Sequence, residues 1–233
     1  MDSGTGHTVK AFDQDLNELR ALISQMGGIA EHAISESMRC LMQRDIDGAR
    51  LVVEADKKLD QLEAEAERSV VRLIALRAPM ADDLRDVVAA LKIAGVVERI
   101  GDYAKNIARR AELLEGGGRI KPVSMLPEMA RIAGEMVHNV LDAFVERDAS
   151  KAQAVCERDK ALDDFYNSIF RALLTFMMEN PQNITESAHL LFVARNLERV
   201  GDHATNIAEM VYFAATGERL AEREKGGNPA IAR

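Results

Sequence analysis

Four pairs of acidic residues in this 233-residue chain have a spacing that suits metal binding. Residues four positions apart on a helix lie on one face, with Cβ atoms roughly 5 to 6 Å apart, and two like charges there destabilise an isolated helix. Two such pairs meeting from neighbouring helices would need a cation, and oxygen donors without cysteine or histidine favour Mg, Ca, Mn or iron over a structural zinc. The pairs are Asp56 and Asp60, Glu98 and Asp102, Asp159 and Asp163, and Glu198 and Asp202.

An internal repeat relates these pairs to one another. The segments 98–108 and 198–208 carry the same residue at eight of eleven positions, and Asp-Lys-x-Leu-Asp runs begin at Asp56 and at Asp159. A charged stripe is most often a solvated surface, here one paired with Arg99, Lys57 and Lys58. Because both pairs are repeated, a metal site and a solvated surface are equally consistent with the residues, which leave both interpretations open.

Gly101 and Gly201 occupy the same place in the two repeated segments. A glycine inside a helix costs about 1 kcal/mol relative to alanine, so something must approach the backbone closely there. Tight helix packing and the approach of a metal or ligand are both consistent with the pattern.

Composition predicts a helical protein that does not bind nucleic acid. Hydrophobic residues make up 47% of the chain but aromatic residues only 4%, and there are 5 prolines, which favours helices over strands. The net charge of −8 argues against a surface that replaces the counterions of nucleic acid. No apolar run reaches the ~18 to 20 residues of a membrane span, and the N-terminus lacks a signal-peptide pattern, so we expect a cytoplasmic location.

Hydrophobic periodicity predicts six helices arranged as two units of three. Glycines 116–118, Pro122 and Pro127 separate the units, while Pro79 and Pro181 each separate the second helix of a unit from its third. We expect repeats at 8–115 and 124–216, with a disordered tail at 217–233. The predicted helices cover residues 8–45, 48–78, 81–115, 125–146, 149–178 and 183–216.

The acidic stripe of each third helix lies opposite its apolar side. Counting ~100° per residue places Glu98, Asp102 and Asn106 together, facing away from Val97 and Ile100. The aspartate pair of the second helix flanks that helix's apolar stripe. The acids are therefore expected on the surface of the unit, where the pairs of the two helices can meet.

The pattern Glu-Arg-Ile/Val-Gly-Asp-x-Ala-x-Asn-Ile-Ala, preceded by Asp-x-x-x-Asp on the second helix, resembles the PhoU family over residues 8–216. The resemblance implies an all-α fold of two tandem three-helix bundles whose acidic pairs bind metal ions, in multinuclear sites of iron, zinc, manganese or magnesium. It makes ligands of Asp56, Asp60, Glu98 and Asp102 in one half, and of Asp159, Asp163, Glu198 and Asp202 in the other. Asn106, Asn206, Arg99 and Arg199 are expected to support those ligands. Arg195 stands where the first half has Gly95, so the two sites need not bind metal equally.

The resemblance also implies regulation rather than catalysis. Family members repress the phosphate-starvation response and modulate phosphate uptake, as adaptors between the ATPase subunit of the phosphate-specific ABC transporter and a PhoR-type sensor histidine kinase. The chain has no Gly-rich phosphate loop and no nucleophile with a paired base, which is consistent with a protein that is not an enzyme. We expect a homodimer that associates with the membrane only through its partners.

An alternative function is a ferritin-like di-iron oxidoreductase. Glu135-Met-Val-His138 and Glu186-Ser-Ala-His189 both have the Glu-x-x-His pattern from which such proteins build an iron centre. Both motifs occur in the second half, at positions that the repeat does not relate. This makes the oxidoreductase the weaker interpretation.

Overall fold

The computed structural model describes residues 4–114 and 124–220, and the all-α prediction is confirmed, because no strand occurs in these ranges. Each predicted helix is present, with ends within four residues of those expected. The elements are α1 (Gly4–Gln43), α2 (Ile46–Arg77), α3 (Ala81–Leu113), α4 (Leu126–Glu146), α5 (Ala149–Glu179), the 3₁₀ turn η2 (Pro181–Asn183) and α6 (Ile184–Thr216).

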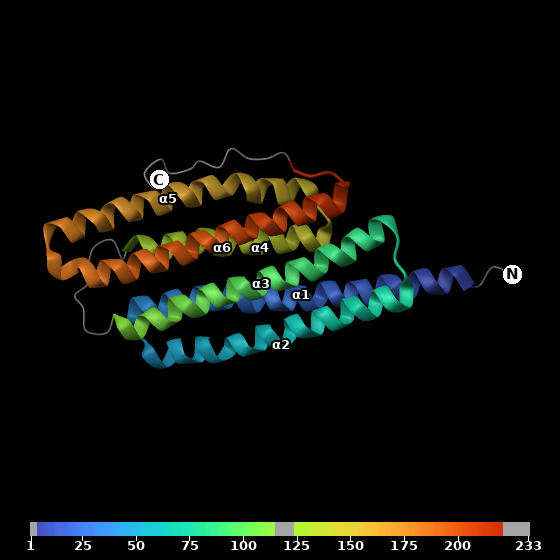
Figure 1. Cartoon of the computed structure of the whole chain (residues 1–233), viewed down its shortest axis with the longest axis horizontal. Coiled ribbons are helices and arrows are strands. Elements are labelled where there is room, and N and C mark those ends of the chain that lie inside the picture. The colour runs from blue at the N-terminus through green and yellow to red at the C-terminus, as the bar shows by residue number, and fades with distance from the viewer. Residues whose placement is uncertain (1–3, 115–123, 221–233) are drawn as a thin grey trace.

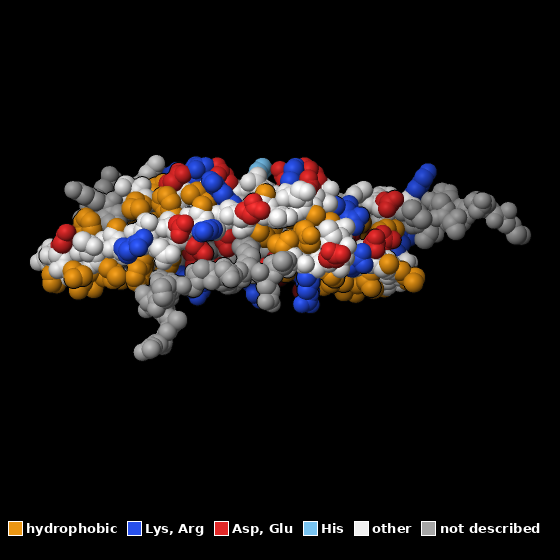
Figure 2. Space-filling model, turned by 90° about the horizontal axis from the view of Figure 1, so that it is seen from above, with side chains coloured by type: hydrophobic (Ala, Val, Ile, Leu, Met, Phe, Trp, Pro, Cys, Tyr) orange, Lys and Arg blue, Asp and Glu red, His pale blue; other side chains and the backbone are white. Residues whose placement is uncertain are grey.

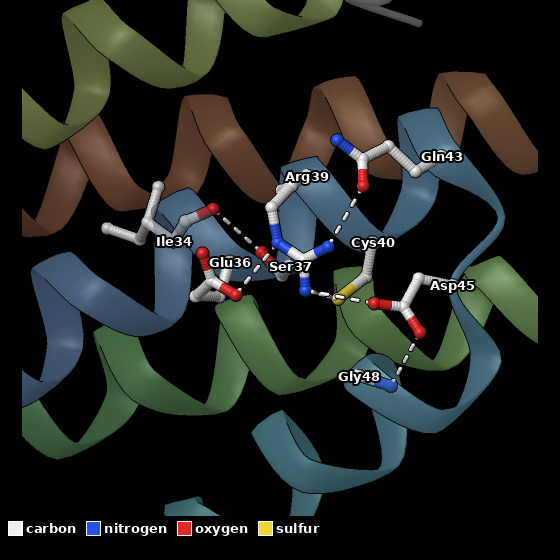
Figure 3. A network of polar contacts seen from close by, with 8 residues as sticks. All are labelled: Ile34, Glu36, Ser37, Arg39, Cys40, Gln43, Asp45 and Gly48. Atoms are coloured by element: carbon white, nitrogen blue, oxygen red, sulfur yellow. Dashed lines mark hydrogen bonds and ion pairs between the residues drawn. The ribbon is translucent and has the colours of Figure 1, made fainter.

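The repeated Arg-Asp dipeptides form the turns between the first two helices of each half. Arg44 (φ 58°) and Arg147 (φ 54°) adopt the left-handed conformation that ends α1 and α4. The next residue caps the following helix: Asp45 Oδ1 accepts from the Gly48 amide at 2.9 Å, and Asp148 accepts from Ser150 and Lys151. Such caps stabilise a helix by about 1 kcal/mol. At the first turn Arg39 also donates to Asp45, at 3.0 Å (Figure 3).

The two halves lie side by side in one six-helix assembly. Helix α3 packs against α6 and α1 against α4, while α2 and α5 lie on the outer sides (Figure 1). The halves run in opposite directions, so that the α2–α3 turn lies at one end of the molecule and the α5–α6 turn at the other. This arrangement is the one that a two-fold axis between the halves would produce.

Charged residues face each other between the halves at related positions. Asp86 on α3 is buried and binds Arg147 at the α4–α5 turn at 3.0 Å, as well as Arg20 on α1 at 3.0 Å. Burial raises the pKa of Glu186 on α6, and the charge of Arg44 at the α1–α2 turn opposes that rise. Each half therefore places a turn arginine beside an acid near the start of the other half's third helix.

The core runs the length of the assembly and is built from aliphatic and small side chains. Ile93, Ile100 and Ile107 on α3 and Leu126 and Met136 on α4 are among its fully buried side chains. Alanines at 90, 94, 104 and 108 of α3 are also fully buried, and their small size lets three helices approach α3 closely. Burial of this apolar surface is the main force that holds the six helices together.

Residues 217–220 follow α6 and belong to the predicted tail, but Leu220 is partly buried against the core. The remaining tail, the three glycines at 116–118 and Pro122 lie outside the described residues. No helix in the described ranges is long and apolar enough to span a bilayer. Figure 2 shows acidic and basic side chains interspersed along one face, with hydrophobic side chains exposed towards both ends.

Candidate functional site

The acidic pairs of α2 and α3 meet in the structure, and a lysine lies between them. Lys105 Nζ is 2.5 Å from Asp56 Oδ2 on α2 and also binds Asp102 on its own helix. Burial opposes the charge of Lys105, but the bonds to Asp102 and Asp56 raise its pKa. Sequence analysis missed this residue because it occupies a variable position of the repeated motif.

Asp56 is more deeply placed than the predicted surface stripe. It is only 7% exposed, and its Oδ1 atom is buried without a hydrogen-bond partner among the described residues. The prediction considered the faces of each helix alone, and the close approach of α3 is what covers Asp56. A buried carboxylate oxygen without a partner is costly, which makes this atom a suitable ligand for a cation.

Gly101 and Gly201 explain how the helices come so close. A Cβ on Gly101 would overlap the side chain of Leu59 and lie 3.4 Å from Asp56 Oδ1. A Cβ on Gly201 would overlap Leu162 and lie 3.3 Å from Asp159 Oδ1. Tight helix packing therefore explains both glycines, and the missing methyl group also leaves room for a carboxylate; the approach of a metal ion remains a prediction.

Glu98 completes the first acidic group. Its pKa is raised to about 7, chiefly by burial and then, in decreasing order, by the charges of Asp102, Glu63, Asp60 and Asp56. Glu63 is a residue that sequence analysis missed, because the second half has Tyr166 in its place and the repeat gives no signal. All four ligands predicted for the first half thus lie within electrostatic range of one another.

The second half repeats this arrangement with different cations. Burial raises the pKa of Glu198 to about 7, with Asp202 and Asp163 raising it and Arg195 opposing. Arg195 Nη1 lies 2.7 Å from Glu198 Oε1, while Glu198 Oε2 is buried and has no hydrogen-bond partner among the described residues.

A threonine replaces the lysine in the second half. Thr205 stands at the position of Lys105, and its hydroxyl donates to the backbone carbonyls of Gly201 at 2.9 Å and Asp202 at 3.1 Å. The charges of Asp163 and Asp202 act on Glu198, and Asp159 lies beside Gly201, but no ammonium group reaches these acids from position 205.

The residues predicted to support the ligands lie mainly between the halves. Tyr103 and His203, at equivalent positions, stack with ring centroids 5.3 Å apart and share a hydrogen bond of 3.1 Å. Burial and the charges of Arg99 and Arg199 lower the pKa of His203, although Asp202 opposes them. Asn206 contacts His203 at 3.3 Å rather than an acid. Asn106 is partly buried.

The chemistry of the two acidic groups suits a hard cation. Their side chains offer oxygen ligands, each half has a buried oxygen without a partner among the described residues, and the glycines leave room for a carboxylate. Within the described ranges, no three His, Cys, Asp or Glu side chains converge closely enough to hold an ion as they stand. In the first half Asp56 and Asp102 instead bind Lys105.

The two Glu-x-x-His motifs do not meet. His138 on α4 lies 3.2 Å from Glu31 on α1, whereas His189 on α6 lies 3.0 Å from the guanidinium of Arg110. Burial and the charge of Arg110 lower the pKa of His189. The geometry gives no support to a di-iron centre built from these motifs.

Comparison with known proteins places this architecture in a family. A model described as the PhoU domain matches residues 23–111 and 126–211. A phosphate-specific transport system accessory protein PhoU homolog from Zymomonas mobilis is 55% identical over 224 residues, which cover 96% of this chain and 94% of that protein. A protein of the same description from Caulobacter vibrioides is 48% identical, over 94% of this chain and 96% of that protein.

Solved structures give the same result. The crystal structure of PhoU from Pseudomonas aeruginosa superposes with a TM-score of 0.85 at 36% identity, covering 89% of this chain and all of that one. The phosphate transport system regulatory protein PhoU from Streptococcus pneumoniae superposes with a TM-score of 0.84 at 26% identity, over 91% of this chain and all of that one. From its repeated helices, its paired acids and these matches, the chain belongs to the PhoU family.

Proposed function

We propose that this protein is a negative regulator of the phosphate-starvation response and a modulator of phosphate uptake. It would act as an adaptor between the ATPase subunit of the phosphate-specific ABC transporter and a PhoR-type sensor histidine kinase. The observation that carries the proposal is similarity along nearly the whole chain, at 55% identity, to a protein described as an accessory of phosphate-specific transport. The description of the Streptococcus pneumoniae neighbour as regulatory supports the same role.

The surface suits a protein that works by binding others. Large hydrophobic side chains are exposed beside the turns at the two ends: Leu76 and Met80 at one end, and Met178 and Ile184 at the other. Contiguous exposed apolar surface marks contact sites for other macromolecules. We propose a homodimeric cytoplasmic protein, with no catalytic activity of its own, that reaches the membrane through its partners.

We further propose that the acidic group of each half binds a metal ion. Asp56, Asp60, Glu98 and Asp102 would hold it in one half, and Asp159, Asp163, Glu198 and Asp202 in the other. A bound cation supplies positive charge that neutralises carboxylates from two helices. The chain's own contribution is to bury Asp56 and part of Glu98 and Glu198, and to hold α2 against α3, and α5 against α6, through the two glycines.

Co-purification from phosphate-replete cells tests the adaptor role. A tagged full-length chain should retain the transporter ATPase and the histidine kinase after crosslinking, and its deletion should switch on a starvation-response reporter at high phosphate. Recovery of neither partner with a folded protein, together with a silent reporter in the deletion strain, would contradict the proposal.

Metal analysis of purified protein tests the acidic sites. The combined change of Asp56, Asp60, Glu98 and Asp102 to alanine should remove the metal of the first half; because it also removes both partners of Lys105, circular dichroism checks that the fold is retained. His138→Ala is the matched control and should leave the metal content unchanged. Loss of metal in His138→Ala, with oxygen turnover by the wild-type protein, would instead favour the di-iron alternative.

A further inference from the structure

Two arginines of the repeated motif lie beside the contact between the halves. Arg99 on α3 and Arg199 on α6 occupy equivalent positions, and both are exposed. The guanidinium carbon of Arg199 is 5.9 Å from the ring centroid of Tyr103, and the charges of both arginines act on His203. Since the two rings touch, both guanidinium groups flank one small surface where α3 and α6 lie side by side (Figure 1). We call this surface the seam surface, and its residues are Arg99, Tyr103, Arg199 and His203.

Neither of these arginines is used in an ion pair. Within residues 4–114 and 124–220, no carboxylate lies within ion-pair distance of Arg99 or Arg199, and neither guanidinium makes a side-chain hydrogen bond. The charge of Arg99 acts on Glu63 and that of Arg199 on Glu198, but from beyond contact distance. The N–H donors of both guanidinium groups are therefore available to a ligand.

The acids of the repeated motif do not cancel the charge of these arginines. Asp102 binds Lys105, and Glu198 binds Arg195, so two of the acids already have a cation in contact. Asp202 does act on the imidazole of the seam surface, but two arginines act there with the opposite sign. The seam surface is therefore a place where positive charge prevails, in a chain whose net charge is −8.

We propose that the seam surface binds a small oxyanion of the phosphate class, held by one guanidinium group from each half. A guanidinium group presents paired N–H donors that match two oxygens of a phosphate. A tetrahedral phosphate has a two-fold axis that exchanges two pairs of its oxygens, so it suits two arginines at equivalent positions of two similar halves. This inference goes beyond the adaptor and metal-binding proposals and depends on neither. It gives the chain a ligand of its own, either free phosphate or the headgroup of an anionic lipid.

Equilibrium dialysis of the full chain against radiolabelled orthophosphate tests the proposal at low ionic strength. Metal ions are first removed with a chelator that is then dialysed away, so that phosphate cannot bind through a metal. Arg99→Gln and Arg199→Gln should each weaken binding on the order of tenfold, and the double variant should abolish it. Arg99→Lys, which keeps the charge without the paired donors, should retain part of the affinity. Arg68→Gln removes another exposed arginine, on α2, and is the control for net charge that should change nothing.

Two further measurements locate the ligand and identify its source. Orthophosphate should move the imidazole NMR shifts of His203 in the wild type but not in the double variant, while those of His32, exposed on α1, should stay unchanged. Vesicles of phosphatidylglycerol are the second probe. If they bind where orthophosphate does not, and the double variant loses that binding, the phosphate group belongs to a lipid.

The outcomes separate this inference from the proposed function. Equal binding of orthophosphate by the wild type and the double variant, or no binding of either probe by the wild type, would overturn the seam surface as an anion site. Recovery of the transporter ATPase and the histidine kinase with the chain is a separate measurement. The adaptor role would therefore stand or fall independently of the seam surface.

Discussion

Glu98 and Glu198 are placed by the same repeated segment, and burial raises the pKa of each to about 7, yet their surroundings differ. The charges that raise the pKa of Glu98 are those of acids, while Lys105 binds Asp56 and Asp102. Glu198 has Arg195 bound directly to it. The two halves share a backbone frame and distribute their positive charge differently within it.

The two halves share a backbone arrangement because of how their helices pack, and not because of their acidic residues. Leu59 sits over Gly101, and Leu162 sits over Gly201, in nearly identical geometry. Both leucines are fully buried, at 1% and 0% exposure. Because this contact sets the distance between helices, the charged residues beside it could diverge without moving the backbone.

The largest expected effect comes from removing the leucine that packs on each glycine, and it tests whether helix packing is equivalent in the two halves. Leu59→Ala and Leu162→Ala should each lower the free energy of unfolding by about 2 to 5 kcal/mol, through lost burial and a cavity. Urea unfolding of the two variants should give similar values. A cost confined to one half would break the equivalence.

A double-mutant cycle supplies the control for this prediction. Gly101→Ala alone should destabilise the protein, because its methyl group meets Leu59. In the Leu59→Ala background that conflict is gone, and the same change should stabilise the helix by up to ~1 kcal/mol. Additive effects would contradict the packing explanation.

The electrostatic interactions of Asp86 and Glu186 across the two halves should be unequal in strength. Asp86 is 6% exposed at its side chain and binds two arginines, so Asp86→Ala should lower the free energy of unfolding by about 1.5 to 3 kcal/mol. Glu186→Ala removes a less enclosed charge and should cost about 1 kcal/mol or less. Burial raises the pKa of Asp86 against the charges of Arg147 and Arg20, so Asp86→Asn, which keeps an acceptor, should cost less than the alanine variant. Thermal and urea unfolding measure both changes. Equal losses of unfolding free energy in Asp86→Ala and Glu186→Ala would contradict this ranking.

The raised pKa values of Glu98 and Glu198 predict a dependence of stability on pH. A carboxyl group whose pKa is higher in the folded than in the unfolded state contributes its full stability below about pH 4.5, and that contribution is lost as the pH rises through about 7. In the presence of a chelator, stability should therefore fall between pH 5 and pH 8.

Glutamine variants sharpen the comparison. Glu98→Gln should stabilise the protein at pH 8 on the order of 1 kcal/mol, and the gain should vanish near pH 4.5. Glu198→Gln should gain less, because it also removes the partner of Arg195. A larger gain in stability from Glu198→Gln than from Glu98→Gln would show that Arg195 does not stabilise the charged form of Glu198 as we describe.

The smallest expected effect lies between the halves. Tyr103→Phe removes the hydrogen bond to His203 but keeps the stacked ring, and should cost about 0.5 to 1 kcal/mol. Nitrogen NMR shifts of His203 should report the lost bond. An unchanged imidazole spectrum would show that the contact is not formed in solution.

The helices and the meeting of the acidic pairs could be predicted because hydrophobic period and duplication are both visible in the chain. Lys105 could not, because it fills a variable position, and its role depends on the distance between α2 and α3. Duplication also relates Tyr103 to His203 without revealing that they touch. That contact follows only once α3 is known to pack against α6.

The covalent link between two similar halves has a genetic consequence. In a homodimer of three-helix subunits, every codon change would alter both acidic groups, and dilution would separate them. In this chain a single codon change alters one group while the other remains as it was. Lysine at position 105 with threonine at position 205 is a difference that a homodimer of one three-helix subunit could not encode.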